Sequence, residues 1–184
     1  MPRRGNDAVG AEVAMRLLVL LTDAFGGRGG IAKFNRDLLR ALTEHRDCEE
    51  VVALPRVITD EIGALPPKLT FRSDAVGSKP RFIRSVLESA RDDRFDAVIC
   101  GHIHLVPAAA YVRQRLGIPA MLVTHGTEAW QPPRGMLCRA LARRVDAFVA
   151  VSELTKQRFV GWTGIDPDCG CVIPNCVSAR EEPT

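Results

Sequence analysis

Short, continuous apolar runs recur along the chain, and they constrain its fold more than any other feature. The first is Leu17-Leu18-Val19-Leu20-Leu21, and a run of this kind without polar alternation is typical of a parallel strand that is buried on both faces. Similar runs predict strands over residues 51–54, 96–100, 118–123, 146–151 and 171–173, with a short strand around residues 69–71.

Segments with helical periodicity lie between these runs. Their apolar residues recur at helical spacing and predict helices over residues 30–42, 78–90, 106–116, 135–144 and 153–160. Gly117 is a typical helix stop, and Ser152 is a predicted N-cap. Strands that alternate with helices over short connections indicate an α/β fold: a doubly wound, mostly parallel, Rossmann-like sheet in a single domain.

The chain of 184 residues is long enough for one domain with a full core. We predict a disordered leader over residues 1–14, the Rossmann-like domain over residues 15–177 and a polar tail over residues 178–184. No apolar run approaches the roughly 20 residues of a membrane span, and the start does not fit a secretory signal. The sequence therefore predicts a cytoplasmic protein, and its net charge of +3 gives no indication of nucleic-acid binding.

The predicted helix over residues 78–90 has an apolar side and a basic side. Its apolar side carries Phe82, Ile83, Val86, Leu87 and Ala90. Its basic side carries Arg81, Arg84 and Arg91, and a second basic cluster follows at Arg139, Arg143 and Arg144. Two interpretations stay open for these clusters: a solvated surface, or peripheral docking on the anionic inner face of the membrane.

A glycine-rich segment, Gly26-Gly27-Arg28-Gly29-Gly30, follows the first strand and precedes a helix. It fits a G-x-G-x-x-A dinucleotide fingerprint, but five residues separate it from the strand and the second strand ends in Leu54-Pro55 without an acidic residue. The alternatives are a flexible turn and a phosphate held by backbone N–H groups at the helix N-terminus. We favour the phosphate, and we expect a Cβ at Gly30 to occupy its space or to forbid a positive φ.

Three of the four histidines fall at the predicted ends of two strands. His125 directly follows the strand over residues 118–123, with Gly126 beside it and Glu128 three residues on, while His102 and His104 follow the strand over residues 96–100. Ligands of open α/β sheets bind beyond the carboxyl ends of the strands, although a structural histidine is an alternative for His125.

The sequence predicts no metal site. His102 and His104 would point to opposite sides of an extended chain. Cys169, Cys171 and Cys176 match no common zinc spacing, while Cys100 and Cys138 stand in apolar contexts and are predicted to be small core residues.

Four stretches in order resemble the N-terminal domain of the family 4 glycosyltransferases, which are retaining enzymes with two facing Rossmann-like domains. The resemblance covers about residues 16–177, and it is carried by residues 25–36, by Asp96-Ala97-Val98-Ile99-Cys100-Gly101-His102, by Thr124-His125-Gly126-Thr127-Glu128-Ala129-Trp130, and by Val149-Ala150-Val151-Ser152 together with Val172-Ile173-Pro174-Asn175.

The resemblance implies a role for each part of this pattern. It implies that the chain is the acceptor-binding half of a retaining hexosyltransferase, with a nucleotide-sugar as co-substrate and no other cofactor. The acceptor would be a sugar, a lipid or a small molecule. We expect catalytic roles for His125 and Glu128, contact of Gly29 and Gly30 with the donor diphosphate, and substrate binding by His102 and Thr127.

The resemblance also has departures. The family has a second domain after the Ile-Pro-Asn segment, with an E-x7-E pair and an Arg/Lys pair, whereas this sequence ends at Thr184 and has Cys176 where the family usually has Gly. We therefore expect a truncated enzyme, inactive without a donor-binding domain that a separate protein could supply. The alternative is a non-enzymatic remnant that binds an anionic ligand or a partner protein.

Overall fold

The computed structural model describes residues 14–92 and 94–176. The predicted leader, apart from Ala14, and the predicted polar tail lie outside the described residues. No helix in the described ranges is long and apolar enough to cross a membrane.

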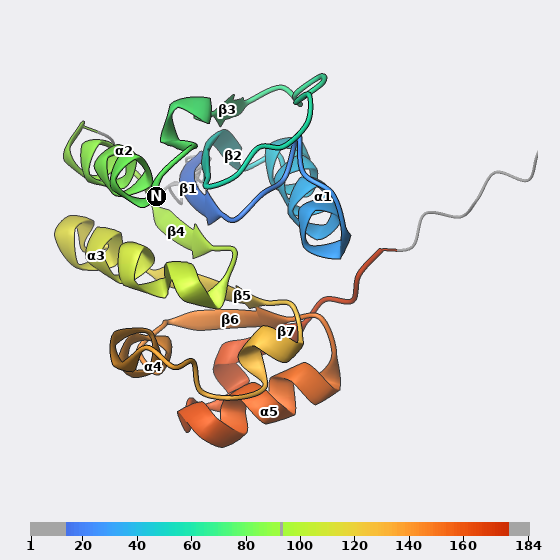
Figure 1. Cartoon of the computed structure of the whole chain (residues 1–184), viewed down its shortest axis with the longest axis vertical. Helices are drawn as coiled ribbons and strands as arrows, with labels where there is room; N and C mark the ends of the chain where they lie inside the picture. Colours follow the sequence, from blue (N-terminus) through green and yellow to red (C-terminus); the bar gives the residue numbers. More distant parts are fainter. Residues whose placement is uncertain (1–13, 93, 177–184) are drawn as a thin grey trace, which may run out of the picture.

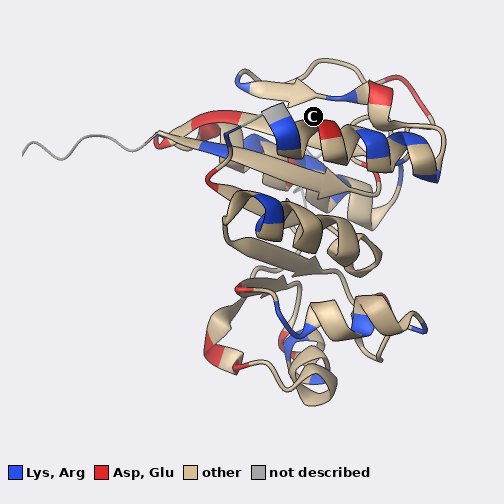
Figure 2. Cartoon of the chain, turned by 90° about the vertical axis from the view of Figure 1, so that its left-hand side faces the viewer, with Lys and Arg blue, Asp and Glu red and all other residues tan. Residues whose placement is uncertain are grey.

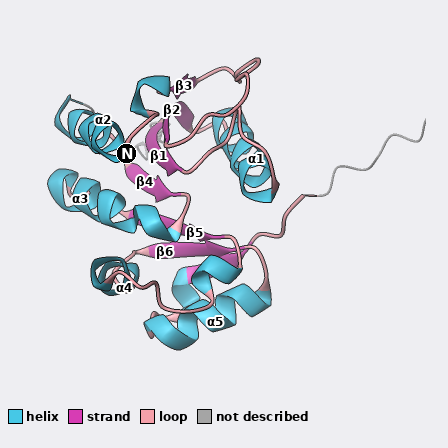
Figure 3. Cartoon of the chain, viewed as in Figure 1, coloured by secondary structure: helices cyan, strands magenta, loops and turns pink. Residues whose placement is uncertain are grey.

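Seven parallel strands form one sheet in the order β3-β2-β1-β4-β5-β6-β7. Figure 3 shows the strands in magenta between the helices. The predicted fold class is therefore confirmed. The strands are β1 (Met15–Leu21), β2 (Cys48–Pro55), β3 (Leu69–Phe71), β4 (Ala97–Cys100), β5 (Ala120–Thr124), β6 (Ala147–Ala150) and β7 (Gly170–Val172).

Helices cover both faces of the sheet (Figure 1). The α-helices are α1 (Gly30–Glu44), α2 (Lys79–Asp92), α3 (Val106–Leu116), α4 (Met136–Ala142) and α5 (Glu153–Thr163). Four short 3₁₀ turns add to them: η1 (Ser73–Ala75), η2 (Ile103–Leu105), η3 (Thr127–Ala129) and η4 (Pro167–Cys169).

The first strand shows why the apolar runs lack alternation. Leu17, Val19 and Leu21 pack toward α1 on one face, whereas Leu18 and Leu20 pack toward α2 and α3 on the other. Because both faces are covered, a polar residue on either side would be buried without a partner.

The ends of two helices form as their sequences predict. Gly117 adopts the left-handed conformation that closes α3, and its N–H donates to the carbonyl oxygen of Arg113. The Ser152 side chain accepts a hydrogen bond from the N–H of Thr155 at the start of α5.

Two side chains are less buried than the sequence suggested: Ile83, placed on the apolar side of its helix, and Cys138, predicted to be a small core residue. Ile83 is 52% exposed, because it lies on the outer side of α2 next to α3 rather than against the sheet. Cys138 is half-buried in the short helix α4, while Cys100 is buried as predicted. All six cysteines are free thiols.

The first basic cluster lies on α2, and the second lies on α4 and the turn that follows it, on the side of the molecule that Figure 2 shows. Several of their guanidinium groups have local partners: Arg84 pairs with Glu88 at 2.7 Å, and Arg143 donates to the carbonyl oxygen of Trp162 at 3.0 Å. Membrane docking by these clusters stays a prediction.

Candidate functional site

The site is set by a reversal of direction within the sheet. From β1 the chain adds β2 and then β3 on one side, and from β4 it adds β5, β6 and β7 on the other. The loops that follow β1 and β4 therefore diverge at a topological switch point, where open α/β sheets bind ligands. The glycine segment follows β1, and His102 follows β4, so both lie at this point.

His125 links the loop after β5 to the loop after β4 and to α1. Its Nε2 lies 2.8 Å from the carbonyl oxygen of Gly101, and its ring meets the ring of Phe34 on α1 edge to face at 5.1 Å. Because a carbonyl oxygen only accepts, Nε2 must carry the proton, which leaves Nδ1 as a hydrogen-bond acceptor. His125 is thus held in one tautomer by the backbone of the neighbouring loop.

The close approach of these loops needs a glycine at position 101. A Cβ on Gly101 would come within 2.6 Å of Cδ2 of Leu21 and 3.0 Å of the carbonyl oxygen of Leu20. Without that side chain the N–H of Gly101 donates to the Leu20 carbonyl at 2.8 Å, which ties the His102 loop to the end of β1.

Glu128 shapes the loop that carries His125. One carboxylate oxygen accepts the backbone N–H groups of His125 at 2.5 Å and Gly126 at 3.2 Å. Thr127 begins the η3 turn and is exposed. The catalytic role predicted for Glu128 and the substrate contact predicted for Thr127 stay predictions.

The prediction that His102 and His104 point to opposite sides is wrong. The chain does not stay extended after β4 but turns into η2, and Nδ1 of His102 accepts the backbone N–H of His104 at 3.2 Å. The two rings therefore lie on the same side, with centroids 5.1 Å apart. Since Nδ1 accepts, the neutral ring of His102 carries its proton on Nε2 and can donate there.

Burial keeps both site histidines neutral. It lowers the pKa of His102 to about 4 and also lowers the pKa of His125, while the nearby charges of Glu128 and Asp23 raise both values by less. A neutral pair offers one donor and one acceptor rather than two positive charges. Within the described ranges, no three His, Cys, Asp or Glu side chains are grouped so that they could hold a metal ion.

The glycine segment leads directly into α1. Gly29 has a φ of 91° and precedes the first helical residue, Gly30. The N–H groups of residues 30–32 have no intrahelical partners, because they belong to the first turn of the helix. No side-chain cap satisfies this end of α1, and its first turn holds no acidic residue.

The expectation about Gly30 needs one correction. The positive φ belongs to Gly29, not Gly30, and a Cβ at Gly30 would meet no protein atom within 4 Å. The space in front of this helix end is therefore open. Contact of Gly29 and Gly30 with a diphosphate stays a prediction.

Neighbouring residues hold the segment in place. Arg36 donates to the carbonyl oxygens of Ala24 at 2.9 Å and Gly27 at 2.8 Å. Arg28 makes a two-fold ion pair with Asp60, at 2.7 and 2.9 Å.

Sequence reasoning missed Asp23 and Asn35. Asp23 lies between the glycine segment and the histidines, where its charge acts on both rings. Asn35 is fully buried and donates to the Asp23 carbonyl oxygen at 2.8 Å. The position of Asp23, two residues beyond β1 at the predicted ligand edge, was the available signal.

The comparisons with known proteins identify the family and the fold. The sequence model of Glycosyltransferase Family 4 matches residues 28–181. No curated protein sequence matches the chain significantly.

Several solved structures share the fold. The apo form of the lipopolysaccharide outer core galactosyltransferase WaaB has a TM-score of 0.61 at 17% identity, over 92% of this chain and 50% of that one. Anabaena Alr3699/HepE in complex with UDP has a TM-score of 0.55 at 17% identity, over 88% and 44%. UDP-GlcNAc 2-epimerase from Methanocaldococcus jannaschii has a TM-score of 0.57 at 20% identity, over 88% and 46%.

The chain spans about half the length of each of these structures. At such identities the likeness shows the fold alone, and this fold serves both transferases and epimerases.

Proposed function

The chain belongs to the family 4 glycosyltransferases, and we propose that it is the acceptor-binding half of a retaining enzyme that moves a hexosyl group from a nucleotide-sugar. The convergence of the glycine segment, His102 and His125 at the switch point of the sheet is the observation that carries this proposal. The structures of Alr3699/HepE with UDP and with UDP-glucose support a nucleotide-sugar as the donor.

The uncapped end of α1 is the proposed contact for the donor diphosphate. Its free N–H groups and the positive end of the helix dipole favour an anion. As the bond to the sugar breaks, the leaving diphosphate gains negative charge, so fixed donors that already point at it lower the barrier.

The two histidines are proposed to orient hydroxyl groups at the reaction centre. Nδ1 of His125 can accept a hydrogen bond from a sugar or acceptor hydroxyl, and Nε2 of His102 can donate one. Their lowered pKa values make them weak bases, so positioning is the role that their chemistry supports better than proton removal.

Transfer is proposed to require a facing donor-binding domain, in the same polypeptide or in a separate protein. One rim with one helix end and two neutral histidines can contact only one side of a nucleotide-sugar. A cytoplasmic site of action, free or at the inner face of the membrane, belongs to the same proposal.

The first test is an amide chemical-shift titration of the whole chain with a nucleoside diphosphate. We expect the amides of residues 30–32 to shift most. The start of α5 is an internal control because Ser152 already caps it. Equal shifts at both helix ends, or none at α1, would overturn the diphosphate contact.

The second test is a transfer assay. The chain is assayed alone and together with a candidate donor-domain protein, using a nucleotide-sugar. Turnover is expected only with the partner, and robust turnover by the chain alone would contradict the need for a facing domain.

A further inference from the structure

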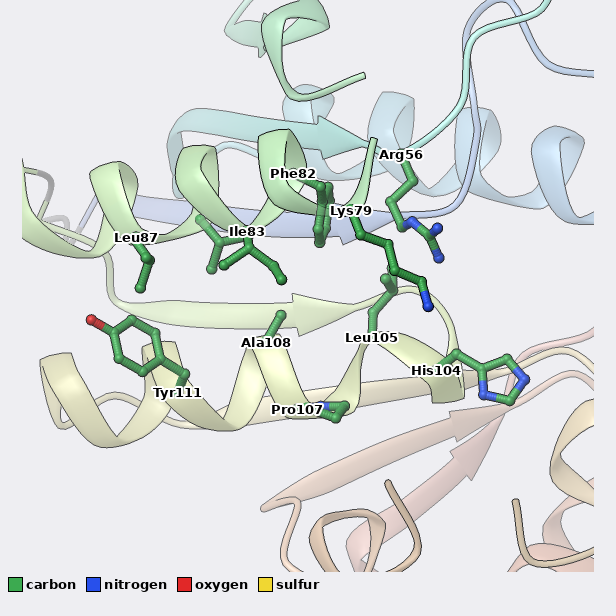
Figure 4. A pocket seen from close by; sticks show the side chains of 11 residues that line it. Arg56, Lys79, Phe82, Ile83, Leu87, His104, Leu105, Pro107, Ala108 and Tyr111 are labelled. Carbon is green, nitrogen blue, oxygen red and sulfur yellow. The ribbon is translucent and has the colours of Figure 1, made fainter. Parts of the chain in front are cut away.

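A groove of about 350 Å³ runs between α2 and α3 (Figure 4). From α2, Phe82, Ile83 and Leu87 line it. On the opposite side the lining comes from Leu105, Pro107, Ala108 and, at the far end, Tyr111. The groove thus has apolar walls, and Ile83 and Tyr111 leave part of that surface open to solvent, at 52% and 38% exposure.

The opposite end of the groove is cationic. Arg56 from the end of β2 and Lys79 from the first turn of α2 lie there, with His104 beside them (Figure 4). No acidic side chain is among the described residues that line the groove. Neither Arg56 nor Lys79 makes a side-chain hydrogen bond or ion pair with any residue in the ranges 14–92 and 94–176.

Two other arginines, one on α2 and one just before η1, do have acidic partners. Arg84 is neutralised by Glu88, and Arg72 by Asp74. Arg56 and Lys79 have no acidic partner among the described residues, and next to an apolar channel they offer complementary charge to an anion that carries an apolar chain.

The cationic end of the groove leads to the candidate site. It lies toward the carboxyl end of β4 (Figure 4). The ring of His104, which lines the groove, is 5.1 Å from the ring of His102. A molecule in the groove therefore has its head group next to the proposed reaction centre and its tail away from it.

We propose that the α2–α3 groove binds the acceptor, and that the acceptor is an anionic amphiphile. Its apolar chain lies between Ile83 and Ala108, and its phosphate or carboxylate lies beside Arg56 and Lys79. A hydroxyl on the same head group then reaches His102. This assignment deepens the proposed function and rests on it.

The test is calorimetric binding of monomeric alkyl phosphates to the whole chain, without any donor. Hexyl, octyl and decyl phosphate form the series. Each added methylene buried in the groove should tighten the dissociation constant by about fourfold until the groove is full. Inorganic phosphate should show no measurable binding, and octyl glucoside, with the same tail but no charge, should bind at least tenfold more weakly than octyl phosphate.

Three substitutions locate the binding. Lys79→Gln and Arg56→Gln should each weaken the binding of octyl phosphate. Ile83→Glu should abolish this binding, because it places a carboxylate in the apolar wall of the groove. Ile83 is already half exposed, so the last change should leave the melting temperature unaltered. Arg91→Gln is the matched control, because it removes the same charge from the far end of the same helix and should leave the affinity unchanged.

Several results would overturn the proposal. If octyl glucoside bound as tightly as octyl phosphate, the site would not recognise an anionic head group. If the affinity for alkyl phosphates did not depend on chain length, the groove would not bind an apolar tail. Binding to anionic vesicles with no binding of monomeric octyl phosphate would mean that this face docks on a membrane instead.

The outcome is separable from that of the proposed function. If alkyl phosphates bind with the expected dependence on chain length but the reconstituted enzyme transfers no sugar, the transferase proposal is refuted. The proposal that the groove binds an anionic amphiphile then still stands. If the enzyme transfers to a neutral soluble sugar and the chain does not bind amphiphiles, only the proposed role of the groove is refuted.

Discussion

Acidification should weaken the fold through His102, and the size of the effect follows from its burial. The unfolded chain takes up this proton near pH 6.5, whereas the folded chain takes it up only near pH 4, since burial lowers the pKa of His102 to about 4. The free energy of unfolding is therefore unaffected by this group above pH 6.5 and falls as the pH drops from 6.5 to 4. A difference of that size corresponds to at most about 3 kcal/mol, and because water screens a half-buried ring we expect about 2 kcal/mol.

The assay is urea unfolding of the wild-type chain and of His102→Gln at a series of pH values. The variant should lose less free energy of unfolding across this window, while Val106→Ala, a buried apolar change in the next helix, should lower it equally at every pH. Parallel profiles for the wild-type chain and His102→Gln would refute the argument. So would an imidazole resonance of His102 that titrates at its ordinary pKa.

Four further substitutions test the site and the fold. In a complete enzyme, His125→Ala should lower the rate of transfer by about tenfold or more, measured in a transfer assay. A thermal melt should show that the variant still folds. Gly30→Val should markedly weaken the binding of a nucleoside diphosphate and only slightly lower the melting temperature. Gly29→Ala should cost about 1–3 kcal/mol of stability, because φ 91° and ψ −179° are a backbone conformation nearly restricted to glycine. Unchanged binding with a large loss of stability for Gly30→Val would make the segment a simple turn. Ser152→Ala should cost about 1 kcal/mol in urea unfolding, through the lost cap of α5.

The sheet was predictable because its signals are local. A continuous run such as residues 17–21 can be satisfied only where both faces are covered. The end of α3 at Gly117 and the start of α5 at Ser152 depend on backbone geometry that their residue types prefer. The alternation of strands and helices then leaves few other topologies.

The site was less predictable because its geometry depends on turns. Spacing alone placed His102 and His104 on opposite sides, but the η2 turn changes the backbone angles between them and brings the rings together. The hydrogen bonds that Glu128 accepts from two backbone N–H groups could not be predicted from its spacing to His125. The loop that carries Asp23 is held by a hydrogen bond from the Asn35 side chain, twelve residues further along in α1, to the Asp23 carbonyl oxygen, and residue spacing does not reveal such a contact.

The two edges of the sheet bear on how this chain behaves at high concentration. Its outermost strands, β3 and β7, have only three residues each. Edges this short present few free N–H and C=O groups, so a second molecule has little to pair with. The long run of β1 is well suited to fibril formation once exposed, but it lies in the middle of the sheet. Fibrils should therefore appear only after unfolding, with a lag that tracks the unfolding rate rather than the protein concentration.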